Sequence, residues 1–174
     1  MIVTFENIKS HRISLESFLM NYRFTEEKHR ILPDDHLKQL IPLDAEGSKF
    51  LWDFIKETRL HGNIPFKEDF FRIIDKAAIL LGNEEEIRKW LYRRGFAFDK
   101  EVILSWTPTE AMIAPWKLFI KYFDSFFYGG SDDLTIFDCS LNWALLFYHQ
   151  DEIYFGTNLD FKPGDDFTDY NSCW

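Results

Sequence analysis

The sequence predicts an α+β fold: a helical N-terminal part followed by a C-terminal antiparallel β-meander with an inserted helix. Apolar residues recur at helical spacing over much of the first 100 residues, and short β-rich segments separated by polar turns follow from residue 134. Apolar residues make up 46% of the chain and aromatic residues 18%, so it can bury a core that offsets its ordering entropy. With no internal repeat or linker, we expect one domain over residues 1–174.

Two short helical patterns occupy the first third of the chain. The first has apolar residues at helical spacing, namely Leu15, Phe18, Leu19 and Tyr22. Ser48 is a typical N-cap residue for a second helix. The expected inner face of that helix consists of Leu51, Phe54 and Ile55.

The longest helical pattern covers residues 66–81. Its apolar stripe consists of Phe66, Phe70, Ile73, Ile74, Ala77 and Leu81. Pro65 suits a first helical position and Gly82 suits a helix end. A further helix is expected to start at Asn83, with Glu86 as its capping-box partner. Its buried side would consist of Ile87, Trp90 and Leu91.

Strand patterns begin after residue 100. Residues 101–106 are short and apolar, which favours a strand. Thr107 and Glu110 then have capping-box spacing, with Pro108 at the first helical position. Another helix is expected to begin at Pro115 and to end before Gly129. Its apolar side would consist of Trp116, Phe119, Ile120, Phe123 and Phe127.

Three β-rich segments with short polar connections complete the predicted fold. They cover residues 134–137, 143–148 and 152–155, and this order predicts a three-stranded meander. The middle segment is apolar throughout, so both of its faces should be covered. We therefore expect Trp143 to be buried in the central strand.

The net charge of −9 arises entirely from the C-terminal part. Residues 1–100 contain 17 basic and 17 acidic residues, whereas residues 101–174 contain 3 basic and 12 acidic ones. A nucleic-acid ligand is not expected, because neutralising phosphates needs a basic stripe. The one-sided charge favours a basic protein partner, which an acidic surface attracts over distance. The alternative is that the acidic residues serve only solubility.

The sequence predicts a cytoplasmic protein. Its N-terminus has no basic region followed by a long apolar stretch, and no segment has the roughly 18–20 apolar residues that span a bilayer. The two cysteines, Cys139 and Cys173, have no metal-site spacing. We expect both to be free thiols in a reducing compartment.

Few residues suggest catalysis or metal binding. Asp132, Asp133 and Asp138 form an acidic cluster, but their spacing does not match a calcium loop. His149 stands beside the carboxylates of Asp151 and Glu152, as a general base can, but no partner nucleophile is evident. The sequence contains neither a phosphate-binding glycine motif nor a nucleophile elbow. We therefore expect a binding protein without cofactor or metal, and not an enzyme.

The C-terminal segment resembles a known class of small bacterial proteins. The runs are Ser131-Asp-Asp-Leu-Thr-Ile-Phe-Asp138, Leu141-Asn-Trp-Ala-Leu-Leu-Phe-Tyr-His149 and Asp151-Glu-Ile-Tyr-Phe-Gly156. They are similar to the C-terminal segment of immunity proteins that neutralise toxins of contact-dependent growth inhibition and related polymorphic toxin systems. The resemblance implies a cytosolic inhibitor of a toxic, often nucleolytic, enzyme, and it assigns no catalytic residue.

The first functional hypothesis is therefore an immunity protein that occludes the active site of a cognate toxin, such as a basic nuclease domain. Carboxylates of the C-terminal part would take the place of the phosphates that the toxin binds, and nearby aromatic residues would anchor the contact. The candidate partner-binding residues are Asp132, Asp133, Asp138, Asp151, Glu152, Asp160, Asp165 and Asp166. The alternatives are a small enzyme that uses His149 with nearby carboxylates, and a general protein-binding adaptor.

Overall fold

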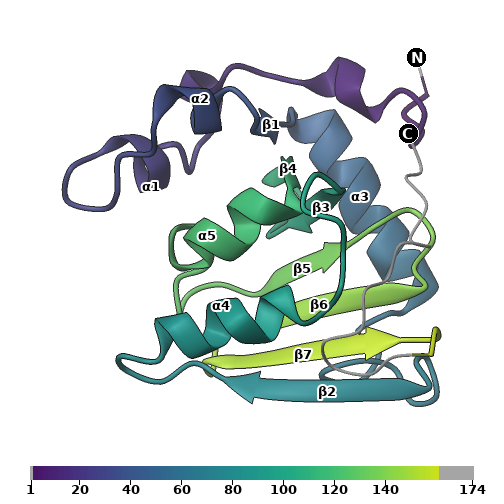
Figure 1. Ribbon diagram of the computed structural model, residues 1–174. Coiled ribbons are helices and arrows are strands. Elements are labelled where there is room, and N and C mark those ends of the chain that lie inside the picture. Colours follow the sequence, from purple (N-terminus) through teal and green to yellow (C-terminus); the bar gives the residue numbers. More distant parts are fainter. Residues whose placement is uncertain (1, 161–174) are drawn as a thin grey trace.

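The structure is a computed structural model that describes residues 2–160. Its centre is a seven-stranded antiparallel sheet in the order β1-β4-β3-β5-β6-β7-β2 (Figure 1). The strands are β1 (Ile41–Pro42), β2 (Ile73–Ala78), β3 (Glu101–Ser105), β4 (Ala111–Pro115), β5 (Leu134–Phe137), β6 (Trp143–Tyr148) and β7 (Glu152–Thr157). The predicted α+β class is confirmed.

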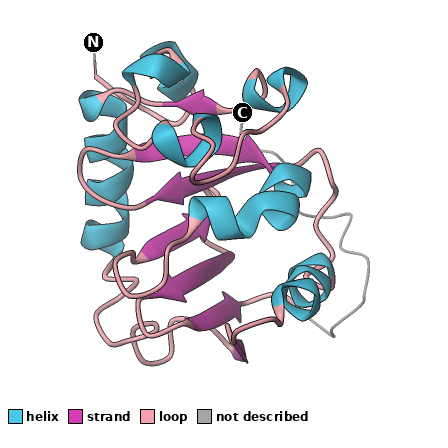
Figure 2. Ribbon diagram, turned by 90° about the vertical axis from the view of Figure 1, so that its left-hand side faces the viewer, coloured by secondary structure: helices cyan, strands magenta, loops and turns pink. Residues whose placement is uncertain are grey.

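Helices cover both faces of the sheet (Figure 2). The longest one, α3, packs on one face, which we call the α3 face. The helices α1, α2, α4 and α5 pack on the opposite face. The bounds are α1 (Tyr22–Thr25), α2 (Asp34–Leu37), α3 (Ala45–Thr58), α4 (Glu84–Tyr92) and α5 (Trp116–Phe126), with short 3-10 turns at Ile8–His11 and Leu15–Ser17.

The predicted meander is confirmed as β5-β6-β7, in which consecutive strands pair antiparallel. The central strand β6 is covered on both faces, as its apolar sequence predicts. Trp143, Leu145 and Phe147 pack under α4 and α5, whereas Ala144 and Leu146 face α3. The side chain of Trp143 is fully buried, so the expectation for this residue is confirmed.

The helix predicted over residues 66–81 is wrong. Residues 73–78 form β2, which pairs with β7 over six residue pairs at the edge of the sheet. Side chains along β2 alternate between half-buried and exposed. The apolar stripe that suggested a helix does not match this alternation, because Ile74 is exposed and Asp75 is half-buried. Pairing with β7 therefore overrides the helical spacing of the sequence.

The predicted N-terminal caps of α3 and α4 differ from those in the structure. Asp44 caps α3, because its carboxylate accepts a hydrogen bond from the Gly47 amide at 2.8 Å. Ser48, the predicted cap, lies buried within the first turns of α3. The helix α4 forms where expected, but Asn83 does not cap it. Its side chain instead bonds to the backbone around Leu80 in the preceding turn.

Two further segments with helical sequence patterns do not form the expected helices. Residues 107–110 form the turn between β3 and β4, in which the Thr107 hydroxyl accepts hydrogen bonds from the next amides. The stripe at residues 15–22 is divided between a 3-10 turn and the start of α1, because the backbone at Phe18 is extended. The helix predicted after Pro115 is confirmed as α5.

Candidate partner-binding site

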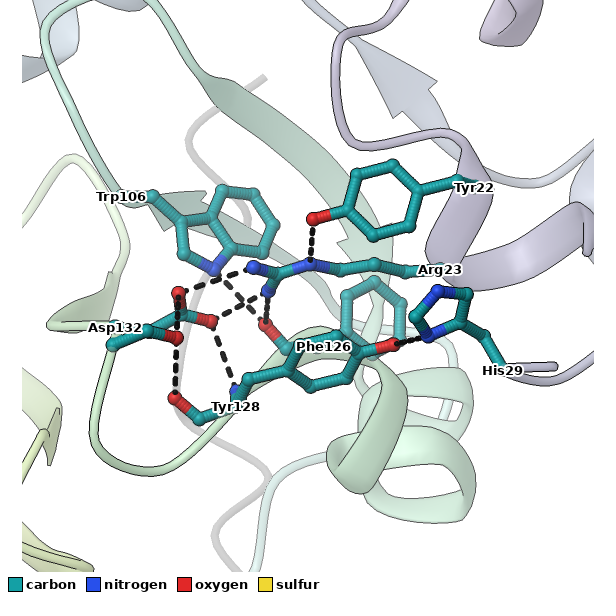
Figure 3. A network of polar contacts seen from close by, with 8 residues as sticks. Tyr22, Arg23, His29, Trp106, Phe126, Tyr128 and Asp132 are labelled. Carbon is teal, nitrogen blue, oxygen red and sulfur yellow. Dashed lines mark hydrogen bonds and ion pairs between the residues drawn. The ribbon is translucent and has the colours of Figure 1, made fainter.

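The predicted partner-binding residue Asp132 belongs to a buried ion pair (Figure 3). Its carboxylate receives both arms of the Arg23 guanidinium, at 2.5 and 3.1 Å, and the Tyr128 amide at 2.9 Å. The two charged side chains are 6% and 10% exposed. Burial alone would lower the pKa of Arg23, but the hydrogen bonds to Asp132 and Tyr22 outweigh it and raise that pKa above its usual range.

Aromatic residues enclose this ion pair and connect distant parts of the chain (Figure 3). The Arg23 guanidinium lies 4.1 Å from the centre of the Tyr128 ring, whose hydroxyl bonds to His29 at 2.9 Å. The Trp106 indole donates to the Phe126 carbonyl at 2.9 Å. The network joins α1 to the turn between α5 and β5. Asp132 therefore holds the fold together, and the prediction that it lies on an exposed acidic surface is wrong.

Asp138 is also unavailable to a partner, because it is 1% exposed. Its carboxylate accepts hydrogen bonds from the Trp143 indole at 2.9 Å and from the Ser140 hydroxyl at 2.5 Å. It also forms an ion pair with buried Lys100 at 3.1 Å. The sequence pattern could not show this burial, since Asp138 directly follows a strand where polar turn residues are expected.

Asp133 and Asp151 lie exposed at the end of the meander. The Asp133 carboxylate is 53% exposed and accepts hydrogen bonds from the backbone and the ring of His149, at 3.0 and 2.9 Å. Asp151 has a left-handed backbone in the turn between β6 and β7. A Cβ at Gly129 would lie 1.9 Å from the Asp151 carboxylate, so a larger residue there would displace that side chain. Within residues 2–160, neither aspartate pairs with a lysine or arginine.

The remaining predicted carboxylates are compensated or lie outside the described residues. Glu152 pairs with Lys76 at 2.6 Å, and the hydrogen bond from Lys76 is the main cause that lowers the pKa of Glu152. Asp160 pairs with Arg72 at 2.5 Å. Asp165 and Asp166 lie outside the described residues. Among the predicted carboxylates that the structure describes, only Asp133 and Asp151 are exposed without a lysine or arginine partner.

A cleft of about 520 Å³ opens on the α3 face beside Asp133, and we call it the α3-face cleft. Its apolar lining includes Trp52 and Ile64, which are exposed, and Leu146 and Tyr148 of β6. Lys56 and Arg59 from the end of α3 also line it, so charges of both signs surround an apolar hollow. Mostly apolar clefts of this size with a few polar groups are typical of binding sites.

The floor of the α3-face cleft carries two hydroxyl groups on neighbouring strands. Ser105 of β3 and Thr135 of β5 are register partners, and Thr135 is in turn paired with Leu146 of β6. All three residues line the cleft. Ser105 is 3% exposed, and its hydroxyl has no hydrogen-bond partner within residues 2–160. A buried hydroxyl without a partner is unusual and costly.

His61 stands over this floor and is held by hydrogen bonds on both sides. Its Nδ1 contacts the Pro65 carbonyl at 2.6 Å and its Nε2 contacts the Thr135 hydroxyl at 2.8 Å. A carbonyl oxygen only accepts, so Nδ1 carries the proton, and Nε2 of the neutral ring accepts from Thr135. Burial lowers the pKa of His61. Sequence inspection missed this residue, because an isolated histidine carries no pattern.

The enzyme alternative has a limited geometric basis. The His149 ring and Asp133 form a half-exposed pair at 2.9 Å, and this is the only hydrogen bond of that ring within the described residues. No group of three or more His, Cys, Asp or Glu residues in the described part of the chain can hold a metal ion. Neither observation supplies a nucleophile for His149.

Cys139 is disulfide-bonded in the structure, so the expectation of a free thiol at this position is wrong. The other cysteine of the chain, Cys173, lies outside the described residues. Disulfides are uncommon in a reducing cytosol, and the cytoplasmic location stays a prediction. No helix within residues 2–160 is both long and apolar enough to cross a membrane.

Comparison with known proteins identifies no relative. No protein-family model matches the chain, and neither a curated protein nor a solved structure matches it. The resemblance to immunity proteins therefore stays a prediction.

Proposed function

We propose that the protein is an immunity protein, which binds a cognate bacterial toxin and blocks its active site. The observation that carries this proposal is the position of Asp133: an exposed carboxylate without a lysine or arginine partner within residues 2–160 lines an apolar cleft. A partner that presents a basic side chain beside an apolar one complements this arrangement. Tight protein interfaces commonly combine a buried apolar anchor with charged groups around it.

The exposed apolar residues around the cleft support binding to a protein. Trp52 and Ile64 are exposed to solvent, whereas most tryptophan and isoleucine residues of the described chain are buried or partly buried. Tryptophan is enriched among the residues that contribute most to interface affinity. The docking face therefore consists of the α3-face cleft together with Asp133 and Asp151.

A basic partner is supported by the two carboxylates of the docking face and by the net charge of the chain. Asp133 and Asp151 can accept lysine or arginine from a partner, whereas Asp132 and Glu152 already hold Arg23 and Lys76. The net charge of −9 adds long-range attraction for a basic protein. Lys56 and Arg59, which also line the cleft, would meet acidic or neutral groups of the same partner.

Charge reversal of the docking face tests this proposal. The partner is first isolated from the native host by co-purification, and association is then measured by surface plasmon resonance at two salt concentrations. The double variant Asp133→Lys, Asp151→Lys should lower the association rate roughly 10–100-fold, because steering by exposed charges is lost. Higher salt should slow the parent protein and affect the variant less, since charges are screened beyond about 8 Å at physiological ionic strength.

The matched control is the double variant Glu26→Lys, Glu27→Lys. Both glutamates are exposed in the loop after α1. Replacing them with lysine changes the net charge by the same amount as the docking-face variant does. We expect the control to keep most of the parental association rate. If both double variants slow association equally, or if the partner is itself acidic, the docking face is assigned wrongly.

A further inference from the structure

We propose that the partner segment that enters the α3-face cleft carries a carboxylate beside its apolar anchor, and that Lys56 and Arg59 bind this carboxylate. The inference rests on the proposed function and deepens it, because it names a second charged group that the docking face receives. It is carried by two exposed cations that line an apolar cleft without an ion-pair partner in the described residues.

The end of α3 brings these two cations to the cleft. Trp52 and Lys56 are four residues apart, so they lie on the same side of the helix, and Arg59 follows directly after its last residue. All three side chains line the cleft, and all three residues are exposed. An aromatic ring and two positive charges therefore border the same hollow.

Neither cation is compensated by a carboxylate within residues 2–160. Lys56 and Arg59 form no ion pair there, because Asp53 of the same helix pairs with Lys49 instead. Asp133 also lines the cleft, but its carboxylate accepts hydrogen bonds from the backbone and the ring of His149. Two lysine and arginine charges thus stand unpaired at the cleft, and they attract an anionic group.

The lining of the cleft defines what accompanies that anionic group. Ile55, Ile64 and Leu146 line the hollow and offer apolar contact, which suits an apolar side chain. Among unmodified side chains, aspartate and glutamate carry a negative charge at neutral pH. A guanidinium binds such a carboxylate through two parallel hydrogen bonds. The cleft therefore fits a segment in which an apolar residue stands next to an acidic one.

This arrangement also makes the docking face selective. A segment with basic residues alone would bring positive charge against Lys56 and Arg59, and like charges at an interface suppress binding. The complementary partner instead directs a basic group to Asp133 and an acidic group to the end of α3. Charges of both signs fix the orientation in which the two proteins meet.

Arg59 offers a variant that removes the charge without weakening the fold. Its backbone is left-handed, with φ of 58°, and glycine is the residue that adopts this conformation most readily at the end of a helix. Arg59→Gly should therefore raise the denaturant concentration at which the protein unfolds. A loss of binding in this variant then cannot be ascribed to unfolding.

A titration of the full chain with two small probes tests the inference without the partner. Isocaproate and isocaproamide share one branched apolar chain, but only isocaproate carries a carboxylate. Nuclear magnetic resonance follows the Trp52 indole and the Thr135 amide near neutral pH while either probe is added. We expect isocaproate to bind at the cleft roughly 3–10-fold more tightly, as exposed ion pairs allow. Higher salt should reduce this preference.

Two cation variants provide the matched comparison. Arg59→Gly should lose most of the preference for isocaproate over isocaproamide. Lys49→Gln should retain it, because Lys49 is a cation of α3 that pairs with Asp53 and does not line the cleft. Both variants remove one positive charge, so a difference between them reports the position of the charge.

The outcomes separate this inference from the proposed function. Equal binding of the two probes, tighter binding of isocaproamide, no binding of either, or an equal effect of Arg59→Gly and Lys49→Gln overturns the carboxylate assignment. The proposed function then still stands if reversal of Asp133 and Asp151 slows toxin association. A preference for isocaproate that Arg59→Gly removes supports the assignment, even where the charge reversal has no effect on association.

Discussion

The two faces of the sheet are covered to different extents. On the side of α4 and α5, large rings fill the space between helices and strands, and Trp116, Phe119, Trp143 and Phe147 are fully buried. On the α3 face, one long helix and the chain after it cover the sheet incompletely. The α3-face cleft opens there, beside the exposed ring of Trp52.

This difference shows why charge alone is a poor guide to a binding surface. Asp132 and Asp133 are adjacent in sequence, yet Asp132 joins a buried ion pair with Arg23 while Asp133 faces water beside the cleft. The first carboxylate stabilises the closed side of the molecule. The second is available to a partner. Burial, which depends on the covering helices, distinguishes the two roles.

Replacing a tryptophan on each face should give the largest contrast. Trp143→Ala removes a ring that lies 4.2 Å from Phe96 between ring centres and that donates to Asp138. We expect a loss of about 3–5 kcal/mol in the free energy of unfolding, because a large cavity forms. Trp52→Ala on the exposed α3 face should lose much less. Denaturant unfolding measures both, and similar losses would contradict the described difference between the faces.

A pair of adjacent aspartate variants should give the next largest contrast. Asp132→Ala leaves the Arg23 guanidinium buried without its counter-ion, which should cost about 3 kcal/mol. Asp133→Asn keeps an oxygen that can accept from the His149 amide, so its cost should stay below about 1 kcal/mol. Thermal and denaturant unfolding of the two variants measures both losses in the free energy of unfolding. A costly Asp133→Asn would show that this residue is structural as well.

The sequence predicted those elements whose composition, length and flanking residues agree. The apolar segment at residues 143–148 has the length and composition of a strand covered on both faces, and α5 begins directly after Pro115 and ends shortly before Gly129. The prediction for residues 73–78 was wrong because their apolar residues have helical spacing, whereas the strand that forms leaves Ile74 exposed. Their structure depends on pairing with β7, a partner more than 70 residues away. Local propensity does not contain that information.

The candidate site was predicted only in part for the same reason. Its acidic residues were found from composition, but their burial depends on Arg23 and Lys100, which are distant in sequence. The cleft floor combines His61, Ser105 and Thr135 from three separate segments. None of these residues has a spacing motif. Only the register of β3 and β5 places the two hydroxyl groups side by side.

The smallest expected effect concerns the dependence of stability on pH at the cleft. Burial lowers the pKa of His61 in the folded state, whereas the unfolded chain keeps the ordinary value of about 6.5. As pH falls through that value, the unfolded state binds a proton that the folded state rejects. His61 therefore contributes stability that is fully present above about pH 6.5 and is lost as pH falls toward its lower folded pKa.

The variant His61→Gln tests this effect, since glutamine does not titrate. The free energy of unfolding is measured from pH 8 to pH 5 for the parent and for His61→Gln. We expect the parent to lose more stability than His61→Gln between pH 7 and pH 5, because only the parent carries the buried imidazole. If His61→Gln follows the parent throughout, the imidazole is not held neutral, and the hydrogen bond from Thr135 to Nε2 is assigned wrongly.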